Sequence, residues 1–178
     1  IDMVGINAGE NILVIGMGNI GLSAVQLAKI YGAGRVIAGD IRENRLKPAG
    51  KYTEHLLNLS DPDAEKKLLD LNAGKKADVV IECSGNPESV DKVFDYVRPE
   101  GRIHLQGQYR QPLIITRYAR WNCSDLKVSA SIALNPGDKE AILKMISEGR
   151  FDAKSLYAKE YFVDDAPQAY RELEKHRY

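Results

Sequence analysis

The sequence predicts an α/β protein with a doubly wound parallel sheet whose helices cover both faces, giving three α/β/α layers. Short apolar runs alternate with longer segments of helical periodicity along the chain. The first run, residues 11–15, leads directly into a glycine-rich turn at residues 16–21 and then a helical pattern. A second run, residues 35–39, ends at Asp40. Alternation of this kind favours a parallel sheet with helices on both sides.

The first half of the chain contains three predicted strand and helix pairs. Pro48 lacks an amide hydrogen, so it interrupts the second helix, which begins at Glu43. Ser60, Asp61 and Pro62 supply the residues that commonly start a helix. We expect strands at residues 11–15, 35–39 and 54–58, and helices after Gly21, at residues 43–51 and at residues 64–71.

The second half continues the alternation with one interruption. Residues 77–83 are typical of a buried parallel strand, and residues 84–87 break it. Residues 108–123 read as a long irregular stretch, whereas residues 126–132 alternate as an edge strand does. We expect strands at residues 77–83, 101–107, 126–132 and 161–163, and helices at residues 88–97, 136–149 and 166–176.

The glycine-rich turn has the spacing of a dinucleotide-binding loop. Gly16 permits a tight turn, Gly18 lets the backbone approach phosphates without a Cβ, and Gly21 lets the helix pack closely on the strand. Phosphates would lie at a helix start that carries about half an elementary charge. Glycine turns are common and methyltransferases carry similar loops, so the flanking strand and helix are needed to predict a pyrophosphate site.

Asp40 follows Gly21 by nineteen residues, close to the spacing of about 20 for a ribose-binding acid. Its carboxylate would accept hydrogen bonds from the ribose hydroxyls of NAD. Against the 2′-phosphate of NADP, like charges about 4 Å apart repel by roughly 4 kcal/mol at an effective dielectric of 20. Arg42 leaves NADP open, since it can pair with a 2′-phosphate or neutralise Asp40. The alternative is a purely structural role for Asp40, as a helix N-cap or a turn residue.

Length, charge and cysteine content narrow the class of protein. At 178 residues the chain is one domain or slightly more, and its formal net charge of zero argues against nucleic-acid and membrane-surface partners. Cys83 and Cys123 form no metal-ligand pattern, and a reduced, cytoplasmic location is the default. No apolar stretch has the length of a membrane span, and no signal peptide is visible.

Four segments in a fixed order carry a resemblance that covers nearly the whole chain: residues 10–22, 38–41, 78–85 and 161–170. Their sequences resemble the cofactor domain of medium-chain, zinc-dependent alcohol and polyol dehydrogenases. The resemblance implies a Rossmann fold over residues 1–150. It also implies that residues 151–178 return toward a GroES-like catalytic domain outside this sequence. The chain has no initiator methionine and stops directly after a helical pattern, so we expect a domain of a longer polypeptide.

The resemblance also implies cofactor contacts at four strand ends. Asn19 and Ile20 would supply backbone amides, and Arg45 would border the adenosine ribose. The turn after residues 77–83 would line the cleft near the adenine and the nicotinamide ribose, and the turn after residues 101–107 would meet the nicotinamide carboxamide. The expected contact residues are Gly16, Gly18, Asn19, Ile20, Gly21, Asp40, Ile41, Arg42, Arg45, Cys83, Ser84, Gly85, Gln106, Gly107 and Gln108.

Catalysis is expected elsewhere in the polypeptide. The family's zinc ligands lie in the GroES-like domain, and His55, His104 and His176 form no ligand or triad pattern in this sequence. We therefore expect neither catalytic nor metal-binding residues here, and Cys83 reads as a small buried hydrophobe. The chain alone would bind NAD without turning over the alcohol, polyol or carbonyl substrate. The resemblance further implies a homodimer formed through residues 126–132.

Other functions remain open at this point. A non-catalytic dinucleotide sensor would share the turn and Asp40, and an S-adenosylmethionine methyltransferase would share a glycine loop and a ribose acid. A short-chain dehydrogenase is excluded because no tyrosine is followed four residues later by lysine. Several aromatic and basic side chains would contact either a large or anionic substrate, or another domain or a dimer partner: Tyr109, Arg110, Tyr118, Arg120 and Trp121.

Overall fold

The computed structural model describes residues 4–132, 137–157 and 159–175 and contains one six-stranded parallel sheet with the order β3-β2-β1-β4-β5-β6. The strands are β1 (Asn11–Ile15), β2 (Arg35–Asp40), β3 (Leu56–Asn58), β4 (Ala77–Glu82), β5 (Val97–Leu105) and β6 (Lys127–Ala130). The α-helices are α1 (Asn19–Ile30), α2 (Glu43–Ala49), α3 (Ala64–Leu71), α4 (Pro87–Tyr96), α5 (Tyr118–Cys123), α6 (Asp138–Ser147) and α7 (Ala166–Lys175). Two 3-10 helices are η1 (Lys154–Leu156) and η2 (Val163–Asp165). The predicted doubly wound sheet is confirmed.

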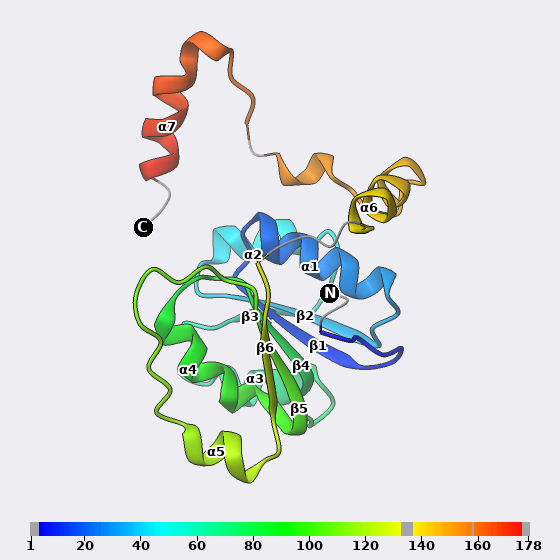
Figure 1. Cartoon of the computed structure of the whole chain (residues 1–178), viewed down its shortest axis with the longest axis vertical. Helices are drawn as coiled ribbons and strands as arrows, with labels where there is room; N and C mark the ends of the chain where they lie inside the picture. The colour runs from blue at the N-terminus through cyan, green and yellow to red at the C-terminus, as the bar shows by residue number, and fades with distance from the viewer. Residues whose placement is uncertain (1–3, 133–136, 158, 176–178) are drawn as a thin grey trace.

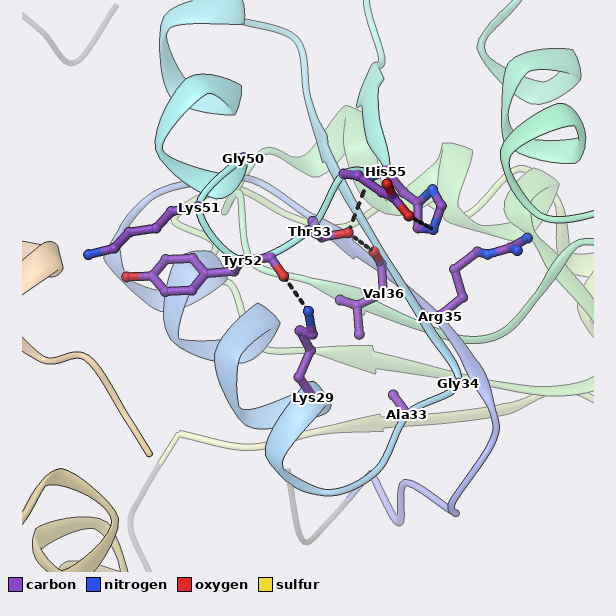
Figure 2. A pocket seen from close by; sticks show the side chains of 11 residues that line it. Lys29, Ala33, Gly34, Arg35, Val36, Gly50, Lys51, Tyr52, Thr53 and His55 are labelled. Carbon is purple, nitrogen blue, oxygen red and sulfur yellow. Dashed lines mark hydrogen bonds and ion pairs between the residues drawn. The ribbon is translucent and has the colours of Figure 1, made fainter. Parts of the chain in front are cut away.

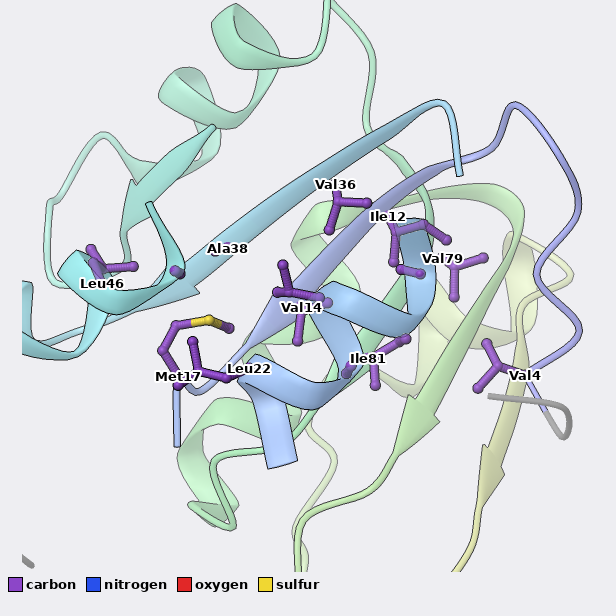
Figure 3. Close-up of a cluster of buried hydrophobic side chains, with 14 residues drawn as sticks. Val4, Ile12, Val14, Met17, Leu22, Val36, Ala38, Leu46, Val79 and Ile81 are labelled. Atoms are coloured by element: carbon purple, nitrogen blue, oxygen red, sulfur yellow. The ribbon is translucent and has the colours of Figure 1, made fainter. Parts of the chain in front are cut away.

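Two buried clusters cover the two faces of the sheet because successive strand residues point to opposite sides. On one face, β1 packs against α1 and α2 through residues such as Val14, Val25 and Leu46 (Figures 1 and 3). On the other face, Leu13 and Phe94 belong to the cluster that includes α3 and α4. Each fully buried aliphatic side chain contributes about 1.5–3 kcal/mol. The three-layer arrangement is therefore stabilised from both sides of β1.

The chain reverses its direction of winding between β1 and β4, which are neighbours in the sheet. The segment after β1 runs to α1 on one face, whereas the segment after β4 runs to α4 on the other. The backbone therefore diverges at the carboxyl ends of these two strands. In doubly wound folds this divergence leaves the crevice in which ligands bind.

Two predictions from the second half of the chain are wrong. The expected strand at residues 161–163 is absent, because this segment joins no sheet and Phe162 is 84% exposed. A strand needs a hydrogen-bonded neighbour, and residues 159–175 extend away from the sheet (Figure 1). The stretch at residues 108–123 is not wholly irregular, since it contains α5. The expected helix limits at Pro136 and His176 lie outside the described residues.

Helix α5 forms because tertiary contacts fix it against α4. Arg120 donates to Asp95 at 2.8 Å, and the Trp121 ring lies 6.0 Å from that of Phe94. Thr116 donates its backbone amide and its hydroxyl to Asp91, both at 2.7 Å. These bonds lower the pKa of Asp91. Contacts between distant residues, rather than local propensity, therefore order this segment.

Several element limits also differ from those predicted. Strand β5 begins at Val97, directly after α4, rather than at Gly101. Its pairing with β4 shifts register between Ala77 and Val79, and Glu100 adopts a positive φ of 59° nearby. Strand β6 is shorter than residues 126–132. Because the pairing is irregular here, apolar and polar residues do not alternate simply along this strand, so its start is not evident from the sequence.

The segment after α6 returns to the sheet domain at Asp152. Gln26 on α1 is 4% exposed, and its Oε1 accepts the Asp152 amide at 2.8 Å. Lys51 forms an ion pair with the Asp152 carboxylate. The hydroxyl of Ser155 donates to the Asp152 carbonyl at 2.9 Å. A buried glutamine thus attaches the start of the C-terminal segment to α1.

Replacing Gln26 with alanine is expected to loosen this attachment. The Asp152 amide loses its acceptor, which costs about 1 kcal/mol of unfolding free energy. Protease cleavage within residues 151–157 should accelerate, as measured by limited proteolysis and mass spectrometry. Gln168→Ala is the control, because Gln168 bonds Glu172 on α7 instead. Equal cleavage rates in the two variants would contradict this account.

Among the described residues, no helix combines the length and the apolar character needed to cross a membrane.

Candidate functional site

The glycine turn fits tightly between β1, α1 and the turn after β4. Gly16 has a φ of +91°, and its amide donates to the Gly39 carbonyl at 2.8 Å. A Cβ on Gly16 would lie 2.6 Å from the Ser84 amide nitrogen. A Cβ on Gly21 would collide with the carbonyl oxygen of Gly16. Any larger residue at either position would force the backbone apart.

Gly18 is different because a Cβ there would meet nothing within 4 Å. It is the N-cap residue of α1, with no side-chain cap and no acidic residue in the first turn. The amides of Asn19, Ile20 and Gly21 have no acceptor within the helix. Ile20 is 56% exposed. An open, positive helix end is therefore exposed where the sequence predicts the pyrophosphate.

Asp40 lies at the end of β2, is 6% exposed, and binds the glycine turn directly. Its Oδ2 accepts the Met17 amide at 2.7 Å, and its Oδ1 accepts the Arg42 amide at 2.9 Å. The carboxylate thus joins the turn after β1 to the N-cap residue of α2. Each oxygen keeps lone-pair capacity for another donor.

The remaining residues expected around Asp40 lie on the same side. Ile41 follows β2 and is 56% exposed, Arg42 is the N-cap residue of α2, and Arg45 is half-buried on that helix. All three follow the carboxyl end of β2. The structure therefore brings them to the same edge of the sheet as the glycine turn.

The turns after β4 and β5 are in contact with each other. Gly85 has a φ of +71°, and a Cβ there would lie 3.1 Å from the carbonyl oxygen of Gln108. A Cβ on Gly107 would lie 2.6 Å from the Gly85 amide nitrogen. Cys83 packs against the α1-side cluster, and burial raises the pKa of its thiol, which disfavours the nucleophilic thiolate form. Close glycine packing therefore holds these two turns together at the carboxyl ends of β4 and β5.

Gln106 directs its side chain toward β6. Its Oε1 lies 3.2 Å from Nε2 of His104 and accepts the Ser131 hydroxyl at 3.1 Å. His104 also lies 2.9 Å from the Ser129 hydroxyl through Nδ1. The backbone amides of Gln106 and Gly107 both donate to the Glu82 carbonyl, at 2.8 and 2.9 Å. A ligand would therefore meet other atoms of these two residues.

His104 is 1% exposed among neutral partners, and burial lowers its pKa from the ordinary 6.5. The unfolded chain then binds more protons than the folded chain as pH falls below 6.5. The free energy of unfolding should therefore decrease as the pH falls from 6.5 to the lowered pKa of His104. Below that pKa the decrease should stop, because both states then bind the proton. His104→Gln should flatten this dependence in urea titrations at pH values on either side of 6.5. His55→Gln, at a partly exposed histidine, is the control and should retain the pH dependence of the wild-type chain. If the free energy of unfolding of His104→Gln depends on pH as steeply as that of the wild type, His104 is not its source.

Three contributors to this edge were not predicted from the sequence. Met17 supplies the amide that binds Asp40, and Glu82 and Tyr109 are hydrogen-bonded to each other at the ends of β4 and β5. From the sequence alone, Tyr109 is expected to contact a large or anionic substrate, another domain or a dimer partner. One sequence signal points to Glu82: it is a charged residue at the end of an apolar strand. Charged side chains are rarely buried without a partner, so a glutamate in this position indicates a specific role.

A separate pocket of about 360 Å³ lies at the opposite, amino end of the strands. It is lined by the end of α1, the start of β2 and residues 50–55 (Figure 2). Lys29 donates to the Tyr52 carbonyl at 2.6 Å, and Arg35 donates to the Leu71 carbonyl at 2.7 Å. Both cations therefore already donate to carbonyl groups of the protein. The carboxyl-end crevice is the better candidate for a dinucleotide.

A metal site does not fit the part of the chain that the structure describes. No three histidine, cysteine, aspartate or glutamate side chains are grouped there so as to hold an ion. His55 and His104 lie in different surroundings, and His176 is outside the described residues. A dinucleotide fits better, because open space over Gly18 faces an uncapped helix end.

Known proteins share both the sequence pattern and the fold. The family model described as zinc-binding dehydrogenase matches residues 19–148. Sorbitol dehydrogenase from Halalkalibacterium halodurans is 30% identical over 94% of this chain and 50% of the relative. D-xylulose reductase A from Aspergillus niger is 30% identical over 97% of this chain and 49% of the relative.

Solved structures agree. An oxidoreductase of unknown specificity from Escherichia coli is 25% identical, with a TM-score of 0.90 over 99% of this chain and 50% of that one. An Escherichia coli alcohol dehydrogenase complexed with NADH is 22% identical, with a TM-score of 0.86 over 97% and 51%. The chain spans about half the length of the curated relatives it matches. The match over residues 19–148 shows that this chain belongs to the zinc-binding dehydrogenase family.

Proposed function

We propose that this chain is the NAD-binding domain of an oxidoreductase that transfers a hydride between an alcohol or polyol and NAD. The observation that carries the proposal is the glycine turn at residues 16–21 bonded through Met17 to Asp40. This arrangement joins a phosphate-binding helix end to a ribose-binding acid. NAD, when bound, supplies the hydride acceptor. The chain's own residues bind and orient it.

The proposed contacts divide between the two halves of the sheet. The pyrophosphate lies over Gly18, and the adenosine ribose lies at Asp40, near Arg45. The turns that contain Gly85 and Gly107 face the nicotinamide half, since a dinucleotide spans the switch point between β1 and β4. The other proposed contacts are Gly16, Asn19, Ile20, Gly21, Ile41, Arg42, Cys83, Ser84, Gln106 and Gln108.

NAD is proposed over NADP because of the carboxylate of Asp40. Two donated amides hold it at the end of β2, so it cannot swing away from a ligand without losing both hydrogen bonds. A 2′-phosphate at about 4 Å would be repelled by roughly 4 kcal/mol at an effective dielectric of 20. Arg42 follows two residues later, and its backbone amide is one of the two donors that hold the Asp40 carboxylate.

Substrate and zinc chemistry are proposed to belong to another part of the polypeptide. Sorbitol dehydrogenase and D-xylulose reductase are named for polyol chemistry, and this chain matches about half of each. We therefore propose that residues 1–150 form the cofactor domain and that residues 151–178 lead toward a catalytic domain. Alone, the chain should bind NAD without catalysing hydride transfer. A cytoplasmic location remains a prediction.

Family membership favours this function over the two alternatives. A methyltransferase or a dinucleotide sensor would share the glycine turn and Asp40. Neither accounts for a dehydrogenase family match that continues to residue 148.

We also propose a homodimer formed through the exposed edge of β6, which is the last strand of the sheet. An edge strand presents unpaired backbone groups that a second copy can bind. Sedimentation at high micromolar concentration should show a dimer. A monomer at that concentration would overturn this part of the proposal.

Calorimetric titration of the 178-residue chain tests the proposed cofactor. NAD should bind with one site per chain and more tightly than NADP, and S-adenosylmethionine should give no saturable heat. Tighter binding of NADP would show that Arg42 rather than Asp40 governs selectivity. Saturable binding of S-adenosylmethionine without NAD binding would overturn the proposed function.

A further inference from the structure

Glu82 is a fully buried carboxylate at the carboxyl end of β4, with 0% of its surface exposed. Its Oε1 accepts the Ser84 amide at 2.9 Å and also the Ser84 hydroxyl. Its Oε2 accepts the hydroxyl of Tyr109. No ion pair to Glu82 occurs within residues 4–132, 137–157 and 159–175. Neutral donors from two separate turns therefore satisfy this buried group.

The same residue holds the two turns through its backbone. The Glu82 carbonyl accepts the amides of Gln106 and Gly107. A Cβ on Gly107 would lie 2.8 Å from Oε2 of Glu82 and 2.6 Å from the Gly85 amide nitrogen. The Glu82 carboxylate and Gly85 therefore pack so closely on Gly107 that a Cβ at position 107 would not fit. Any shift of the Glu82 side chain would move both turns.

Tyr109 fixes the near end of an exposed segment. Burial and the hydrogen bond to Glu82 raise the pKa of its phenol, so the hydroxyl stays a proton donor. Residues 110–114 after it are exposed, and the segment is held again at Ile115, which packs against the cluster that includes Phe94, and at Thr116, which donates to Asp91 on α4. The Glu82–Tyr109 hydrogen bond therefore sets where this segment leaves the crevice.

We propose that Glu82 is a positioning residue for the nicotinamide half of the cofactor site, and that it acts by holding the turn after β4 against the turn after β5. The inference rests on the proposed NAD site. Glu82 itself is not proposed to contact the cofactor. Its effect passes through Ser84, Gly85 and Gly107, which line the crevice.

Glu82→Gln tests the proposal because an amide keeps the shape of the carboxylate but has one acceptor oxygen. If that oxygen keeps the bonds from Ser84, the amide NH2 faces Tyr109, whose hydroxyl must then turn from donor to acceptor. NAD affinity measured by calorimetry should fall about tenfold. Affinity for adenosine monophosphate should change less than about twofold, because the adenosine half binds at β1 and β2. Tyr109→Phe should weaken NAD binding less, and the double variant should be no weaker than Glu82→Gln.

Asp78→Asn is the matched control, since Asp78 is a carboxylate on the same strand but at its amino end. It accepts the Asn11 amide at 2.8 Å and pairs with Arg98. It should lower thermal stability and leave NAD affinity unchanged. Two results would overturn the proposal. In the first, Glu82→Gln binds NAD as tightly as this control. In the second, it loses affinity for NAD and for adenosine monophosphate equally.

Amide hydrogen exchange in the ligand-free chain separates this inference from the proposed function. Faster exchange at Ser84 and Tyr109 is expected in Glu82→Gln and, more weakly, in Tyr109→Phe. If the wild-type chain does not bind NAD, the proposed function fails whatever the exchange shows. Unchanged exchange at both turns in both variants would overturn the role of Glu82 even if NAD binds.

Discussion

Gly18→Ala is expected to weaken NAD binding by at least about 100-fold while the fold stays intact. A Cβ at this position meets no protein atom within 4 Å, so the space it would enter is the space proposed for the pyrophosphate. The φ of −80° suits alanine, and the loss of unfolding free energy should stay within about 1 kcal/mol. Calorimetry with NAD and urea unfolding measure the two quantities separately.

Two further glycines give matched comparisons for Gly18→Ala. Gly137 also has open space around a Cβ but lies at the start of α6, so Gly137→Ala should change neither quantity appreciably. Gly21→Ala should cost about 1–3 kcal/mol of unfolding free energy, because its Cβ would collide with the Gly16 carbonyl. If Gly18→Ala binds NAD with the affinity of the wild-type chain, the phosphates do not lie over Gly18.

Asp40→Ala is expected to affect both binding and stability. Loss of charge-assisted hydrogen bonds to the ribose hydroxyls should weaken NAD by about 3 kcal/mol, or roughly 100-fold. The Met17 amide, on a residue that is 3% exposed, would lose its acceptor at a cost of about 1–3 kcal/mol. The affinity for NADP relative to NAD should rise at least about tenfold, because the charge repulsion disappears. Parallel titrations with the two cofactors measure this ratio.

Asp70→Ala is the control for Asp40→Ala, because Asp70 is an exposed aspartate on α3. It should leave affinity and stability unchanged. If Asp40→Ala loses stability but retains the NAD affinity of the control, then Asp40 is only a structural support for the glycine turn.

Local spacing explains why the positions of the glycine turn and Asp40 are predictable from the sequence. The glycines at positions 16, 18 and 21 follow directly after a strand, and Asp40 ends the next one, so one βαβ unit brings them together. The contact between Asp40 and the Met17 amide was not predictable, because a backbone donor leaves no residue-type signal. Sequence spacing thus indicates position but not which atoms are already bonded.

Features that depend on distant contacts were missed for the same reason. Helix α5 depends on Asp95 and Phe94 of α4, and no local pattern reveals those partners. Residues 161–163 have strand propensity, but no strand neighbour lies beside them in the described structure. Propensity is realised only where the tertiary structure supplies hydrogen-bond partners.

Hydrogen exchange with and without NAD tests most directly whether the dinucleotide occupies the carboxyl ends of the strands. Exchange should slow in residues 16–22, 40–42, 83–86 and 106–109 when NAD is present. No change is expected in residues 29, 33–36 and 50–55, which line the pocket at the amino ends (Figure 2). Protection at that pocket, with none at the glycine turn, would contradict the account.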